Sequence, residues 1–165
     1  MPAVSITGAQ ELEAWLGDLP ASVLAVVAAT SAVLADELRD LVHQKLTGGV
    51  LQTRTGALAA SIGVDGPTLT GDQVVTTIYS GGDLKYAAIQ EFGGVTSPHD
   101  ILPDRAKALA FLAGGQQVFA RVVHHPGSRI PERSYLRSSL AEMTGQIEAD
   151  IKAAALGAIA QKSRA

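Results

Sequence analysis

The chain has 165 residues and a net charge of −3, and 47% of its residues are hydrophobic while 18% are charged. This composition is typical of a globular protein and excludes a disordered one, and the length fits a single domain over residues 1–165. The absence of cysteine excludes disulfides, thiolate zinc sites and cysteine nucleophiles. We expect no signal peptide, because the N-terminus has no basic region followed by an apolar run. We expect no membrane partner, because the longest apolar-rich stretch, Val23–Ala35, is too short to span a bilayer.

The N-terminal part, residues 7–46, is predicted to be helical. Thr7 can cap a short helix from Gly8 to Trp15, and Pro20 fits the first turn of a second helix that runs to Leu46. Glycines after Thr47 supply the stop, because glycine adopts the left-handed conformation at little cost. The second helix carries an apolar stripe at helical spacing, formed by Val27, Leu34, Leu38, Leu41 and Leu46.

The middle part, residues 47–125, is predicted to form a sheet with an extended arm or loop. The β-branched run from Gln73 to Tyr79 indicates one strand. Two further strands, Ala108–Leu112 and Gln117–Val123, are joined by a glycine turn and predict an antiparallel hairpin. A strand at Val50–Gln52 or at Ser61–Val64 would complete the sheet.

The C-terminal part, residues 131–160, is predicted to be one helix with Pro131 near its start. Its apolar residues recur at spacings of three and four and give the strongest periodic signal in the chain: Leu136, Leu140, Met143, Ile147 and Ile151. The order of elements predicts an α+β fold, with long N-terminal helices and a C-terminal helix packed on a small antiparallel β-sheet.

The only residues that suggest a chemical site are histidines and one aspartate beside them. His99, Asp100, His124 and His125 could in principle converge on a metal, but adjacent histidines on a strand point to opposite faces. The chain has no phosphate-binding glycine loop, nucleophile elbow or His-Glu-x-x-His motif. We therefore expect no catalytic residues, no metal and no cofactor. A small metal-dependent hydrolase that uses His99, Asp100 and His124 stays an alternative.

Charge is distributed unevenly along the chain. Residues 1–120 hold 6 Lys/Arg against 12 Asp/Glu, whereas residues 121–165 hold 7 Lys/Arg against 4 Asp/Glu. Opposite signs at two ends suit head-to-tail packing of identical subunits, although ordinary solvated faces would give the same pattern. The basic C-terminal part leaves open a peptide- or DNA-binding module, which we rank last because the chain is acidic overall.

Three segments in this order resemble the phage tail-completion and virion-morphogenesis families of neck or minor tail proteins. The first is Thr-Arg-Thr-Gly-Ala-Leu-Ala-Ala-Ser-Ile at 53–62, the second Tyr-Ala-Ala-Ile-Gln-Glu-Phe-Gly-Gly at 86–94, and the third Ile-Pro-Glu-Arg-Ser-Tyr-Leu-Arg at 130–137. The resemblance covers Leu46 to Met143. The long loop Val95–Lys107 and the hairpin after it are similar to the virion-morphogenesis branch of Mu-like phages.

The resemblance implies a structural subunit of the bacteriophage neck or tail, found in the virion after assembly in the bacterial cytoplasm. It implies a homo-oligomeric ring, expected to be a hexamer, between the head–tail connector and the tail tube or terminator protein. DNA could pass through such a ring without sequence-specific recognition. A tail terminator is an alternative role for the same chain.

The same three segments supply the residues that we expect at interfaces. Thr55 can cap a short helical segment, Glu91 is expected to pair with Arg133, and Arg133 and Arg137 are expected to share a helix face. Tyr86, Ile89 and Phe92 stand three apart and are expected to face the core. The full set of expected interface residues is Arg54, Thr55, Gly56, Leu58, Glu91, Phe92, Gly93, Arg133, Tyr135 and Arg137.

Overall fold

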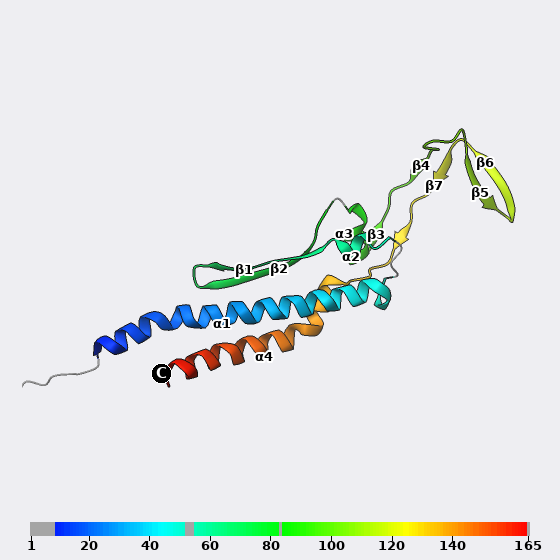
Figure 1. The fold of residues 1–165 in the computed structure, drawn as a ribbon. Helices are drawn as coiled ribbons and strands as arrows, with labels where there is room; N and C mark the ends of the chain where they lie inside the picture. Colours follow the sequence, from blue (N-terminus) through cyan, green and yellow to red (C-terminus); the bar gives the residue numbers. More distant parts are fainter. Residues whose placement is uncertain (1–8, 52–54, 83, 165) are drawn as a thin grey trace, which may run out of the picture. The chain divides into compact units, whose positions relative to one another are not determined.

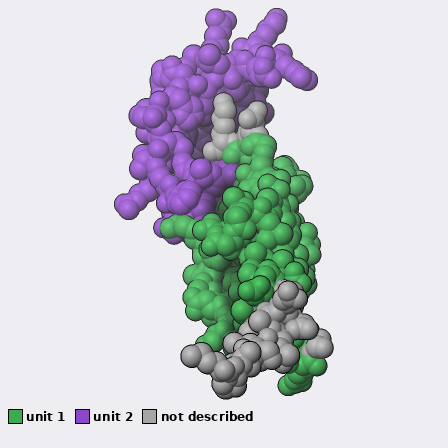
Figure 2. Space-filling view, turned by 90° about the vertical axis from the view of Figure 1, so that its left-hand side faces the viewer, with its two compact units in different colours: residues 1–84, 135–165 green, residues 85–134 purple. Residues whose placement is uncertain are grey.

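The computed structural model describes residues 9–51, 55–82 and 84–164. The fold is α+β, as predicted, with a long N-terminal helix, a C-terminal helix and short antiparallel strands (Figure 1). Although the sequence suggests one domain, the residues group into two compact units, coloured separately in Figure 2. Unit 1 holds residues 1–84 and 135–165, and unit 2 holds residues 85–134. Unit 2 is therefore an insertion in the chain of unit 1.

Helix α1 spans Ala9–Gln44 without interruption, so the prediction of two helices is wrong. Pro20 lies inside it, where a proline costs about 3 kcal/mol because it removes a hydrogen bond and crowds the preceding turn. A lysine near the C-terminus contacts α1 on both sides of this proline. The Nζ of Lys162 lies 3.6 Å from Oδ2 of Asp18 and 3.4 Å from Oγ of Ser22. The predicted cap, Thr7, lies outside the described residues.

The end of α1 is a π-turn, η1, over Lys45–Gly49. Gly48 has a φ of 136°, which non-glycine residues rarely adopt, so the predicted glycine stop is confirmed. The backbone N–H groups of Val50 and Leu51 both donate to the carbonyl oxygen of Lys45. These bonds satisfy a helix-end carbonyl and turn the chain away from the helix axis.

Helix α4 spans Leu136–Lys162 and runs antiparallel to α1 (Figure 1). The direction follows from the contacts, because Lys45 meets Glu142 near one end and Asp18 meets Lys162 near the other. The helix begins five residues after Pro131, so the predicted start is wrong. Arg129–Ile130, strand β8, pairs with Gly94–Val95, strand β3, and the N–H of Arg133 donates to the carbonyl of Gln90. These bonds keep the proline segment extended.

The remaining elements of unit 1 are α2 at Ala57–Ala60 and a hairpin of β1, Ile62–Thr70, with β2, Gln73–Ser80. Both strands match predicted runs, although β1 is longer than predicted. Even-numbered residues of β2 are less exposed than odd-numbered ones, and Oγ1 of Thr76 lies 3.1 Å from Oγ of Ser31 on α1. The hairpin therefore lays one face on α1. Val50 and Leu51 form no strand, and Gln52 lies outside the described residues.

The core of unit 1 is small and lies where α1, β1 and the start of α4 meet. It contains the buried residues Val42, Leu46, Ile62 and Tyr135, and Tyr135 is only 1% exposed. Half-buried Leu58 of α2 and Ile78 of β2 pack against this group. The long helices thus share a packed end.

Unit 2 begins with α3, Lys85–Phe92, and continues as an antiparallel ribbon. Beyond the β3–β8 pair, β4 at His99–Ile101 pairs with β7 at Val123–His125, and β5 at Leu109–Ala113 pairs with β6 at Gln116–Ala120. The predicted hairpin is confirmed, because Gly114 and Gly115 both have positive φ angles at its turn. The described residues therefore form four two-stranded sheets instead of one small sheet.

Most of α1 together with η1 forms an apolar helical segment that is longer than the sequence predicts. Leu16–Gly49 is long and apolar enough to cross a bilayer. The most apolar 18 residues of this segment have a mean hydropathy of 1.8, and 11% of them are buried. The apolar segment is therefore longer than the stretch Val23–Ala35 that the sequence indicates. The core helix of a soluble protein can have the same length and composition, and α1 contacts β2 and α4 in unit 1.

Candidate functional site

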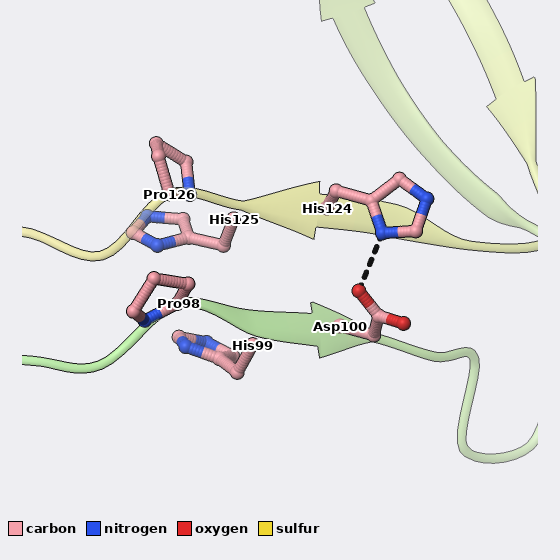
Figure 3. Close-up of a pocket in the computed structure, with 6 residues that line it drawn as sticks. All are labelled: Pro98, His99, Asp100, His124, His125 and Pro126. Atoms are coloured by element: carbon pink, nitrogen blue, oxygen red, sulfur yellow. Dashed lines mark hydrogen bonds and ion pairs between the residues drawn. The ribbon is translucent and has the colours of Figure 1, made fainter.

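The His99–His125 pair and the Asp100–His124 pair lie on opposite faces of the β4–β7 ribbon. The register pairs His99 with His125 and Asp100 with His124, as Figure 3 shows. The rings of His99 and His125 stack with their centroids 5.0 Å apart and their planes 26° apart. Nδ1 of His124 lies 2.5 Å from Oδ1 of Asp100. Pro98 and Pro126 complete an open hollow around these four side chains.

This geometry separates the residues that the hydrolase alternative needs. Facing residues of an antiparallel pair share a face, and the next residues along each strand take the other face. His99 therefore points away from the side that holds Asp100 and His124, and the expectation that adjacent histidines diverge is confirmed. In the ranges that the structure describes, no group of three His, Asp or Glu residues could hold a metal ion. The proposed ligand set of His99, Asp100 and His124 is not brought together.

The first of the three segments that resemble the phage families, residues 53–62, contains α2. Arg54 lies outside the described residues. Gly56 is the N-terminal cap of α2 in a left-handed conformation, and Oγ1 of Thr55 accepts a long 3.4 Å hydrogen bond from the N–H of Ala57. Leu58 is half-buried against the core of unit 1. This segment therefore docks α2 on the core, and Thr55, Ala57 and Ala60 are exposed.

The second segment is α3, and its burial differs from the predicted pattern. Glu91 is only 3% exposed, whereas Phe92 is 60% and Tyr86 41% exposed, so the expectation that these aromatics face the core is wrong. Oγ of Ser134 donates a 2.8 Å hydrogen bond to Oε1 of Glu91. This bond partly satisfies a carboxylate that burial would otherwise destabilise. The helix thus turns its acid inward and Phe92 outward.

The expected pairing of Glu91 with Arg133 is also wrong. The Arg133 side chain is exposed and forms no ion pair with Glu91 in the described part of unit 2, where Ser134 contacts the Glu91 carboxylate. Its contribution is its backbone N–H, which donates to the carbonyl of Gln90 at 2.8 Å. A side chain at Gly93 would meet the backbone nitrogen of Glu132 at 2.7 Å, so glycine permits this close approach.

The third segment joins unit 2 to α4. Tyr135 is buried in the core of unit 1, and its carbonyl accepts a 2.6 Å hydrogen bond from Oγ of the fully buried Ser139. Arg137 is exposed on the first turn of α4, but Arg133 precedes the helix. The two arginines therefore do not share a helix face, which corrects that expectation.

Comparisons with known protein families, with curated proteins and with solved structures find no match for this chain.

Two apolar surfaces are features that the sequence analysis did not single out. The first is the β5–β6 hairpin, where Leu112 is 77% and Phe119 66% exposed. The second is a groove of about 230 Å³ in unit 1, between α1, β2 and α4. Groove-lining residues include Leu34, Leu38, Val74, Ile78, Leu140 and Ile147. The hairpin carries a signal in the sequence, because a strand pair with apolar residues on both faces is typical of a buried sheet.

Proposed function

We propose that this chain is a structural subunit of the bacteriophage neck or tail, acting in tail completion or head–tail joining. Copies of the chain form a ring, with six subunits expected, between the connector and the tail tube. The protein resides in the virion and is assembled in the bacterial cytoplasm. The tail-terminator position is the alternative within the same class.

The observation that carries this proposal is the amount of apolar surface that the chain leaves open. Large aliphatic and aromatic side chains are more than 60% exposed at Val95, Leu102, Leu112 and Phe119. Exposed apolar side chains that lie together are typical of protein interaction sites, and Leu112 and Phe119 share one face of the β5–β6 hairpin. Unit 2 offers this surface on strand pairs, and unpaired strand edges are ready to hydrogen-bond with a neighbour.

The positions of the three segments that resemble the phage families support the proposal further. Each segment precedes or forms a helix: the first leads into α2, the second is α3 and the third leads into α4. The second segment places exposed Phe92 beside buried Glu91, and the third places exposed Arg137 two residues after buried Tyr135. These two segments fix the fold with one residue and offer a nearby one to a partner.

Electron microscopy of negatively stained samples, combined with mass photometry, tests the proposal. The purified chain is imaged alone and with the tail-tube protein encoded by the same genome, and purified particles are checked for the chain by mass spectrometry. Closed rings, or caps on tube ends, are expected. A chain that ignores the tube and is absent from purified particles would overturn the proposal. A monomeric state of the chain alone would not, because the tube can trigger assembly.

A further inference from the structure

The β5–β6 hairpin is apolar on both faces. The register pairs Phe111 with Val118 on one face and places Leu112 and Phe119 together on the other. The second face is the more open, because Leu112 is 77% and Phe119 66% exposed, against 39% for Phe111. Among the described residues β5 pairs only with β6. Since an isolated two-stranded hairpin is marginally stable in water, this hairpin gains stability when a partner covers it.

The groove of unit 1 is apolar and has room for an aromatic ring. Leu34 and Leu38 are buried within it, and Leu140 is 50% exposed at α4. Its volume of about 230 Å³ exceeds the ~150 Å³ of an apolar cavity known to hold benzene. The groove therefore has volume enough for a phenylalanine ring.

Charge makes the two surfaces complementary. Lys107 precedes the hairpin and Arg121 follows it, and no acidic residue occurs between Arg105 and Ile130. Along α4, no basic residue occurs between Arg137 and Lys152, and exposed Glu148 and Asp150 stand next to the groove-lining Ile147 and Ile151. Opposite potentials of this kind steer association and fix its orientation.

We propose that the Leu112–Phe119 face of one copy's hairpin docks into the α1–β2–α4 groove of a second copy. This inference rests on the self-assembly in the proposed function and specifies its contact. The two surfaces belong to the same chain but differ from each other, so the interface is head-to-tail. Repetition of a head-to-tail contact produces a ring when the rotation closes.

Cysteine cross-linking between two populations tests this contact, because the chain has no cysteine of its own. Gln117→Cys places a thiol on the docking face, cross-strand from Leu112, and leaves Leu112 and Phe119 intact. Thr144→Cys places one on the exposed side of α4, at spacings of four and three from Leu140 and Ile147. The two variants are purified separately, mixed in equal amounts and treated with a short bismaleimide. We expect a dimer whose linked peptides contain residues 117 and 144.

A matched control uses Ala149→Cys, which is exposed on the opposite side of α4. Mixed with Gln117→Cys, it is expected to give at least tenfold less linked dimer. Adding Phe119→Ser to Gln117→Cys is expected to reduce the 117–144 product to the control level, and circular dichroism verifies that this variant keeps its helices. Equal yields at 144 and 149 would overturn the inference.

Imaging of the same mixtures separates this inference from the proposed function. Rings that form without a 117–144 link would leave the ring proposal standing and overturn the contact. A 117–144 link without closed rings would support the contact and count against the ring. Absence of both, with and without the tube protein, would overturn the two together.

Discussion

Lys45, at the start of η1, contacts Glu142, near the start of α4, across 97 positions of the chain. The Nζ of Lys45 lies 2.6 Å from Oε1 of Glu142 and 2.7 Å from Oγ of Ser138. The lysine side chain is 11% exposed and the glutamate side chain 57%. The lysine is therefore the desolvated partner, and this carboxylate is the acidic group that contacts its ammonium.

We expect Glu142→Ala to destabilise the fold more than Lys45→Met does. The first change leaves an almost buried ammonium without its carboxylate, which costs about 1–3 kcal/mol, whereas the second returns a half-exposed carboxylate to water. Urea unfolding measures both differences. Exposed Glu148→Ala on the same helix is the control and is expected to stay within about 0.5 kcal/mol of the parent. Equal free energies of unfolding for Glu142→Ala and Glu148→Ala would contradict the expectation.

The small core of unit 1 predicts a strong contrast between two leucines. Leu46 is 3% exposed in the core, and Leu156 is 56% exposed on α4. Leu46→Ala is expected to lower the free energy of unfolding by about 2–5 kcal/mol, because the substitution leaves a cavity. Leu156→Ala is expected to change it by less than about 0.5 kcal/mol. Thermal unfolding followed by circular dichroism compares the two, and similar losses would argue against the described core.

Gly93 and Gly114 both have positive φ angles but differ in their surroundings. A Cβ at Gly93 would meet backbone of Glu132, whereas one at Gly114 would meet nothing within 4 Å. Both alanine variants bear a conformational cost of about 1–2 kcal/mol, and Gly93→Ala adds the clash. We expect faster hydrogen exchange at Arg133 in Gly93→Ala but not in Gly114→Ala. Unchanged exchange at Arg133 in both variants would show that the loop relaxes freely.

The diverging histidines predict weak zinc binding. Because His124 and Asp100 lie on one face and His99 on the other, titration calorimetry is expected to show no stoichiometric zinc binding. His43→Ala is a control that leaves the ribbon intact. One tightly bound zinc per chain, lost in both His99→Ala and His124→Ala, would restore the hydrolase alternative.

Local patterns predicted most of the elements. The β-branched run of β2, the glycine turn of the β5–β6 hairpin and the periodic stripe of α4 each have a cause within a few residues. The single helix α1 was missed because a proline also fits the first turn of a new helix, and the Lys162 contacts that flank Pro20 come from far away in sequence. The late start of α4 depends likewise on the pairing of β8 with β3.

The candidate site was less predictable for the same reason. The opposite faces of His124 and His125 follow from strand geometry alone, so sequence reasoning found them. The burial of Glu91 and the exposure of Phe92 depend on how α3 rotates against the segment around Ser134. No spacing in α3 itself records that rotation, since either side of so short a helix carries apolar residues.

The insertion of unit 2 into unit 1 sets an order for folding during synthesis. Tyr135 must reach Val42 and Leu46 to close the core of unit 1, and the ribosome makes all of unit 2 before it makes Tyr135. Unit 2 can therefore pair its strands while α1 still waits for α4. During that interval the apolar stripe of α1 is open to chaperones, and a slow passage through residues 85–134 lengthens this exposure.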